Sequence, residues 1–190
     1  MIHQIFDVLR TELNTFLTAQ SASNLEAKVE FMNEEPSDGI KFPSNCICPI
    51  LIRIEEEKML RQEDRYLRTK DQNNYLSSAP GIPVHLYIMF VARYKNYLEG
   101  LKNLSHVVRF FQSRPTFTND LLSTIPELRI ELHTPNPTAL NEIWSMLRVP
   151  LHPSVIYRVS LLMLEADLPL QTGKVVKKGG SLLELKHIEE

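Results

Sequence analysis

The chain has 190 residues, of which 43% are hydrophobic and 23% are charged, with a net charge of −2 and a pI near 6.3. This length predicts one domain whose core needs no disulfide framework. The charge balance argues against a nucleic-acid-binding or membrane-surface protein, and no apolar run approaches the roughly 20 residues of a membrane helix.

The first expected element is an amphipathic helix over about residues 2–19, because apolar residues recur there at helical spacing. The segment lacks the basic leader of a signal peptide. Alternating residues in "LEAKVEF", residues 25–31, then predict a half-buried strand.

The run "PILIRIEEE", residues 49–57, predicts the next strand. Pro49 belongs at its start or on a sheet edge, because proline cannot donate to a strand ladder. Strict alternation places the isoleucines and the charged residues on opposite faces: Ile50, Ile52 and Ile54 against Arg53 and Glu55.

The strongest strand signal is "VHLYIMFVARY", residues 84–94. Both of its faces are apolar, which predicts that both are covered. The second face carries Tyr87, Met89 and Val91, and either a helix or another subunit is expected to cover it.

A helix is expected after residue 96, where "NYLE" has the spacing of a capping box. On a helical wheel, Phe111 falls inside the apolar stripe that begins at Tyr97, whereas Phe110 falls outside it. Phe110 therefore needs another cover, either Phe117 brought back beyond Pro115 or a neighbouring subunit.

The last elements are a strand in "ELRIELH", a helix in "NPTALNEIWSML" and a strand in "PSVIYRVSLLMLEAD". The first has Leu128, Ile130 and Leu132 on its inner face. The helix carries Trp144 on its apolar side, where a core position is expected.

Together these elements predict a single α+β domain, with a mostly antiparallel sheet and helices packed on it. We expect this domain over residues 1–167 and a C-terminal tail over 168–190, either a hairpin or an arm that binds a partner. A long polar connection after Glu57 contains Arg61, Arg65 and Arg68, and such long loops are often functional or mobile.

Residues with catalytic or metal-binding potential are scattered. Cys46 and Cys48 are too few for a structural zinc site, and there is no Gly-x-Ser-x-Gly motif or phosphate-binding glycine loop. We therefore expect no metal, no cofactor and no catalytic site. The less favoured alternative is a small hydrolase or acyl-transfer enzyme that uses Ser105, His106 or Cys46.

The order and spacing of several packing motifs resemble the sheath-cap, or tail-terminator, proteins of contractile injection systems, such as antifeeding-prophage-like particles. The motifs are the end of the "VHLYIMFVARY" strand, "LKNLS", "FFQSRPTF", Trp144 and the Pro153-Ser154-x-x-Tyr157 pattern. One departure is that Arg148-Val149-Pro150 stands where the family is expected to have a helix-ending glycine.

The resemblance implies a tail-terminator fold and a non-enzymatic protein of the bacterial cytoplasm that is assembled into an injection particle. It implies a hexameric ring at the distal end of the inner tube and contractile sheath, which ends polymerisation and stays attached to the sheath. A baseplate or adaptor protein of the same machine is the alternative. The expected partners are other copies of the chain and the tube and sheath proteins, without nucleic acid or membrane.

A closed ring requires two different contact patches on each subunit. The candidate contacts for subunits or partners come from four places in the sequence: the second face of the 84–94 strand, the end of the following helix, the polar connection and the tail. They are Tyr87, Met89, Val91, Phe110, Arg61, Arg65, Arg68, Lys174, Val175, Val176 and Lys177.

Overall fold

The computed structural model describes residues 2–20, 28–32, 41–57, 68–71, 74–77, 82–118, 127–164 and 171–174. The chain divides into two compact units. The first comprises Met1–Leu60 and Ile82–Leu164, and the second comprises Arg61–Gly81 and Glu165–Glu190.

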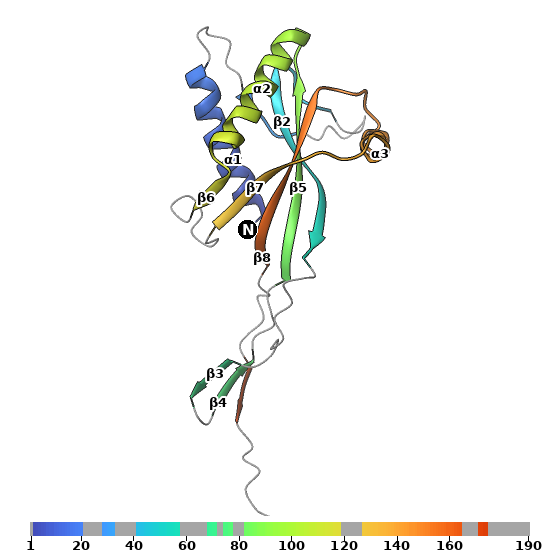
Figure 1. Ribbon diagram of the computed structural model, residues 1–190. Helices are drawn as coiled ribbons and strands as arrows, with labels where there is room; N and C mark the ends of the chain where they lie inside the picture. The colour runs from blue at the N-terminus through green and yellow to red at the C-terminus, as the bar shows by residue number, and fades with distance from the viewer. Residues whose placement is uncertain are drawn as a thin grey trace, which may run out of the picture. The chain divides into compact units, whose positions relative to one another are not determined.

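The first unit is built on a six-stranded sheet with strand order β1-β2-β5-β8-β7-β6 (Figure 1). The β1–β2 pair is parallel and every other pair in this sheet is antiparallel. The strands are β1 (Lys28–Val29), β2 (Cys46–Glu56), β5 (Ile82–Arg93), β6 (Thr116–Thr118), β7 (Glu127–His133) and β8 (Ser154–Leu164).

Helices α1 (Ile2–Gln20) and α2 (Tyr97–Ser113) cover one face of this sheet, and α3 (Pro137–Leu147) lies on the other side (Figure 1). The α+β fold with a mostly antiparallel sheet is thus confirmed. None of the described helices is long and apolar enough to cross a membrane.

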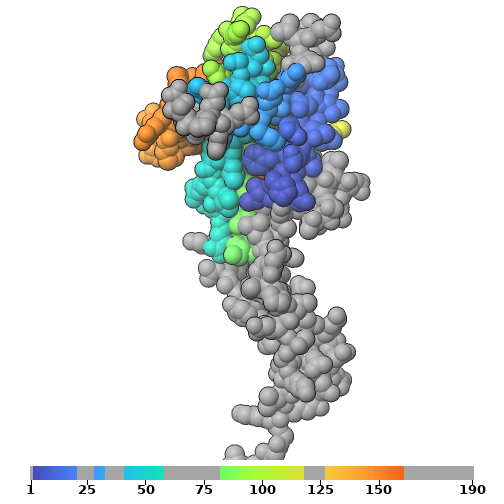
Figure 2. All heavy atoms as spheres, turned by 180° about the vertical axis from the view of Figure 1, so that it is seen from behind, coloured from blue at the N-terminus to red at the C-terminus, as the bar shows by residue number. Residues whose placement is uncertain are grey.

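The larger core lies between the sheet and the pair α1 and α2. Helix α1 buries one residue per turn, at Ile5, Leu9, Leu13 and Leu17, as its apolar spacing predicts. Figure 2 shows the outer side of α1, in blue.

Phe110 belongs to this core, so its side chain is not at the surface, where the second of its two expected covers, a neighbouring subunit, would require it. Its side chain is 1% exposed, and its ring centroid lies 5.3 Å from Phe16 and 6.1 Å from Phe117. The physical reason is that α2 packs against α1 as well as against the sheet, which widens the buried stripe of the helix. Phe117 does return against Phe110, as one of the two expected covers.

The same packing rotates the buried stripe of α2 away from the expected one. Gly100 and Asn103 are buried, whereas Tyr97 is 64% exposed. A prediction of the buried face from hydrophobic residues alone ignores glycine and asparagine. It therefore places the buried face of α2 too close to Tyr97. Asn96 caps the helix by accepting a hydrogen bond from the Leu98 backbone N–H.

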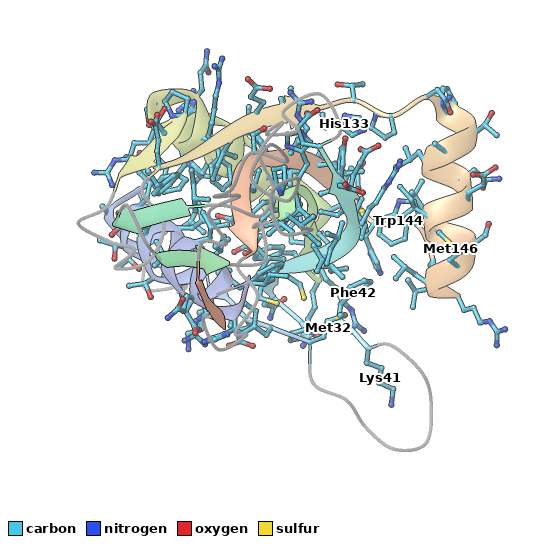
Figure 3. All side chains as sticks on the ribbon, turned by 90° about the horizontal axis from the view of Figure 1, so that it is seen from below. Met32, Lys41, Phe42, His133, Trp144 and Met146 are labelled. Atoms are coloured by element: carbon cyan, nitrogen blue, oxygen red, sulfur yellow. The ribbon has the colours of Figure 1, made fainter. Side chains whose placement is uncertain are left out.

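A second, smaller core covers the opposite face of the sheet. Met89 and Val91 are fully buried there with Trp144, which is 5% exposed, and Phe42. Trp144 and Phe42 lie between α3 and the sheet (Figure 3). The second cover of β5 is therefore a helix of the same chain, and Trp144 occupies the expected core position.

A β-bulge breaks the alternation of β2. Ile50 pairs with Met89 and Leu51 with Ile88, but the next pair is Arg53 with Tyr87. Ile52 is the additional residue, so the residues beyond it change faces. Arg53 therefore lies on the same face as Ile50, which corrects the expected alternation.

Two isoleucine or leucine positions expected to face the core are largely exposed. The bulge leaves Ile54 at 47% exposure, and Leu132 is 58% exposed although Leu128 and Ile130 are buried. Leu132 is the penultimate residue of β7, where the helices no longer cover the strand.

Helix α3 ends at Arg148, which has φ 54° and ψ 33°. This left-handed conformation is the one that glycine usually supplies after a helix. The helix thus ends in the geometry that a glycine would favour, although arginine occupies the position.

The second unit contains a three-stranded antiparallel sheet of order β3-β4-β9. It consists of β3 (Arg68–Asp71), β4 (Asn74–Ser77) and β9 (Gln171–Lys174). A strand of the predicted tail thus pairs with a strand of the long polar connection. Residues 58–67 and 175–190 lie outside the described residues.

We expect Phe110→Ala to lower the free energy of unfolding by about 3–5 kcal/mol, because it removes a large, fully buried side chain. Urea denaturation measures the change. Leu98→Ala, at a position with 73% exposure, is the matched control and should change stability by about 0.5 kcal/mol or less. Unchanged stability of the Phe110 variant would contradict the core assignment.

We expect Arg148→Gly to raise the free energy of unfolding by about 0.5–1 kcal/mol, because glycine adopts the left-handed conformation without steric cost. Thermal unfolding of the purified protein measures the gain. Val149→Gly, one residue later and packed against the second core, should instead destabilise. A lower free energy of unfolding in the Arg148→Gly variant would contradict the prediction. It would show that interactions of the Arg148 side chain stabilise the fold by more than its left-handed backbone conformation costs.

Candidate interaction surface

A row of polar side chains crosses four strands on the face that carries α3. Arg53 pairs with Tyr87, Tyr87 with Arg158, and Arg158 with Glu131. The neighbouring row, Ile50, Met89 and Ile156, is apolar and belongs to the second core. The cover of the second core therefore ends between these two rows.

The side chains of this row and its neighbours are linked to one another. The Tyr87 hydroxyl donates to Glu55 Oε2 at 2.7 Å, and Arg53 Nη2 donates to Glu55 Oε1 at 2.9 Å. Arg158 Nη2 donates to Glu131 Oε2 at 2.6 Å. We call the following residues the polar strip: Arg53, Glu55, Glu57, His85, Tyr87, Arg129, Glu131, His133 and Arg158.

The strip balances three arginines with three glutamates. Arg129 Nε lies 2.8 Å from Glu131 Oε1, and the His133 ring packs edge-on against Tyr87 with centroids 4.8 Å apart. Such a balanced surface favours orientation and selectivity in protein contacts more than raw affinity.

A hollow of about 550 Å³ lies at the β2 end of the polar strip. His85 is 9% exposed and its Nε2 lies 2.7 Å from Glu57 Oε2, while His85 Nδ1 is buried without a hydrogen-bond partner. The hollow is lined by Arg53, Ile54, Glu55, Glu56, Glu57, His85, Tyr87 and Arg158.

Burial and the hydrogen bonds within the polar strip shift the pKa values of several of its residues. Burial, followed by the hydrogen bond to Glu55, raises the pKa of Tyr87. The hydrogen bond from Arg158 lowers the pKa of Glu131 and raises the pKa of Arg158. Tyr87 therefore stays neutral, and the Glu131–Arg158 pair stays charged, around neutral pH.

The structure separates the candidate contact residues into three groups. Tyr87 is half-buried and central to the polar strip, so it stays a candidate. Met89, Val91 and Phe110 are buried within the first unit, and their side chains are not at its surface. The remaining candidates belong to the second unit.

Arg68 and Lys174 lie in the outer strands β3 and β9 of the three-stranded sheet. Arg61, Arg65, Val175, Val176 and Lys177 lie outside the described residues.

The residues of the alternative enzyme do not form a catalytic group. Ser105 is exposed and donates to the Leu101 carbonyl at 2.8 Å. Cys46 donates to the Pro43 carbonyl, and burial raises its pKa to about 12. Burial and the neighbouring Lys102 and Arg109 lower the pKa of His106.

Among the residues that the structure describes, none of these three side chains has a titratable hydrogen-bond partner that would make a nucleophile and base pair. Across the described ranges, no group of three or more His, Cys, Asp or Glu residues is placed to hold a metal ion.

Sequence reasoning missed most of the polar strip, because the bulge that assembles it leaves no clear signal. One signal was present. Val91, Met89 and Tyr87 lie on one face of β5. Read from Val91 back toward the start of the strand, Tyr87 is the first of them whose side chain can form a strong hydrogen bond. It marks the point where an apolar face becomes polar.

We expect Glu131→Gln to reduce stability at pH 7 by about 0.5 kcal/mol, as for an exposed ion pair. The pKa of Glu131 is lowered on folding, so its contribution is present above the unfolded value near 4.3 and is lost as the pH falls through the folded value. Denaturation curves from pH 7 to 3 should therefore converge with wild type in acid. Glu142→Gln on the exposed side of α3 is the control, and a constant difference at all pH values would contradict the assignment.

Comparison with known proteins identifies a matching family and solved structures with a similar fold. The family described as the Pvc16 N-terminal domain matches residues 4–178. No curated protein sequence matches the chain.

Among solved structures, the chain is similar to the sheath/tube terminator of PVC, an extracellular contractile injection system, in its extended state. The identity is 16% and the TM-score 0.61, over 100% of this chain and 65% of that chain. It is also similar to the tube-terminating cap of the anti-feeding prophage, with 13% identity and a TM-score of 0.55, over 93% of this chain and 59% of that chain.

The chain thus spans less than two thirds of the length of either structure. These comparisons confirm the resemblance drawn from the packing motifs. They also confirm the terminator-like fold. The chain belongs to the Pvc16 N-terminal domain family.

Proposed function

We propose that this chain caps the distal end of the inner tube and contractile sheath of a phage-tail-like injection system. In this role it ends polymerisation and anchors the sheath during contraction. The observation that carries the proposal is the family match over residues 4–178, together with a fold shared along the whole chain with a sheath/tube terminator.

We further propose that the cap is a ring of six copies joined head to tail. Such a ring requires two different patches on each subunit. Exposed apolar side chains occur on elements of opposite faces of the sheet: Tyr97 and Leu98 on α2, and Met146 and Leu151 on and after α3, with exposures between 64% and 74%. We propose that the patch on α2 of one subunit contacts the patch at α3 of the next subunit around the ring.

The polar strip around Tyr87 is our candidate for a contact with a tube or sheath protein. Its balanced charges suit a selective contact that must survive a change of sheath geometry. In the second unit, we assign the same kind of contact to Arg61, Arg65 and Arg68, and we propose that the segment from Lys174 to Lys177 contacts another copy of the chain.

A baseplate or adaptor role in the same machine remains the alternative function. The two solved structures described above are a terminator and a cap, which favours the distal end of the tube. We propose that the protein assembles into particles in the bacterial cytoplasm.

Deletion of the gene should give particles of uncontrolled length in electron micrographs, because nothing ends the growth of the tube. Complementation with wild type should restore the length. Leu98→Glu and Met146→Glu change exposed positions and should leave folding intact, yet fail to restore the length if the ring depends on the two apolar patches. Normal particle lengths in the deletion strain would contradict the capping function.

A further inference from the structure

The outer edge of β2 has a neighbour over only part of its length. Strand β1 pairs with Cys46 and Ile47. In the part of the chain that the structure describes, β2 has no other strand on that side from Cys48 to Glu56. Figure 2 shows β2, in cyan to teal, at the surface beside α1 and below α3.

The backbone groups on this edge can be assigned from two hydrogen bonds. The Ile47 carbonyl accepts from Glu30 N–H at 3.0 Å on the β1 side, so Pro49, two residues on, also faces outward and loses no ladder bond. Glu57 N–H donates inward to the Pro83 carbonyl at 2.8 Å. Alternation then directs the backbone of Ile54 and Glu56 outward.

The hollow of about 550 Å³ follows the same stretch. Five consecutive residues, Arg53 to Glu57, line it. Their side chains alternate between the two faces of the sheet, and the hollow also extends inward to Tyr87 and Arg158, so it reaches the edge of β2 at one end.

The edge of β2 from Pro49 to Ile52 has features that block strand pairing. The edge from Ile54 to Glu57 has side chains that could accept an added strand. Pro49 and the bulge at Ile52 oppose the addition of a strand. From Ile54 to Glu57 the edge carries one exposed apolar side chain and three carboxylates. This part favours an added strand with basic side chains and one apolar residue.

We propose that residues 175–178 of a second copy of this chain add to β2 as a parallel strand along Ile54–Glu56. This proposal rests on the self-association proposed above. The segment reads Val-Val-Lys-Lys, and it follows directly on strand β9. Strand addition supplies main-chain hydrogen bonds, while side chains set the specificity.

One register makes all neighbouring side chains compatible. With Val176 beside Ile54 in a parallel strand, Lys177 lies beside Glu55 and Lys178 beside Glu56. The antiparallel alternative with Val176 beside Ile54 would place Lys177 beside Arg53. The parallel direction is also that of β1, which occupies the start of the same edge.

Disulfide trapping between two different chains tests the contact. Ile54→Cys and Val176→Cys proteins are purified separately, mixed and oxidised, and the covalent heterodimer is measured on a denaturing gel. We expect a heterodimer from this pair and none above background from the control pair Met146→Cys and Val176→Cys. Burial raises the pKa of native Cys46 and Cys48 to about 12, so neither thiol competes.

Charge reversal tests the register. Glu55→Lys with Glu56→Lys in the Ile54→Cys protein should lower the heterodimer yield about tenfold, because two attractive cross-strand pairs become repulsive. Lys177→Glu with Lys178→Glu in the Val176→Cys partner should restore it. Equal yields from the two pairs of cysteines, or no rescue by the exchanged charges, would overturn the proposal.

Removal of residues 175–190 separates this contact from the proposed function. We expect the shortened protein to lose self-association in sedimentation measurements and to leave particle length uncontrolled. If it still forms rings and restores particle length, the arm contact is overturned and the capping function stands. If full-length protein fails to restore particle length in the deletion strain, the capping function itself fails.

Discussion

Strand β5 must be covered on both faces, and the rest of the first unit follows from this constraint. Burying a large apolar side chain is worth roughly 1.5–3 kcal/mol, and β5 carries a run of them on each face. Phe90 and Ile88 require α1 and α2, whereas Met89 and Val91 require α3. A single layer of helices would leave half of this strand in water.

Helix α3 is short, and its cover ends where Tyr87 replaces the apolar side chains of β5. From that row onward the uncovered sheet face needs polar side chains that satisfy one another. The bulge in β2 meets this need by moving Arg53 and Glu55 onto the same face as Tyr87. The polar strip and the hollow beside it are therefore consequences of the length of α3 and of one inserted residue in β2.

This division suits the proposed capping role. The fully packed half of the sheet provides a rigid body, while the uncovered half exposes polar groups and the edge of β2 has, among the described residues, backbone without a strand partner. A terminator must bind the end of a polymer without offering the next subunit a site. An edge that carries a proline, a bulge and carboxylates restricts which strands can add to it.

The sequence by itself determined the helices, the main strands, the α+β class and the family, because these depend on local periodicity and on the order of packing motifs. It placed Trp144 and the apolar face of α1 correctly. It failed at Phe110, because the width of a buried stripe depends on how many neighbours a helix has. It failed at Ile54 and at the polar strip, because a bulge is set by pairing with another strand. Tertiary structure alone decided which side chains meet across β2, β5, β8 and β7, since these contacts join residues far apart in the chain.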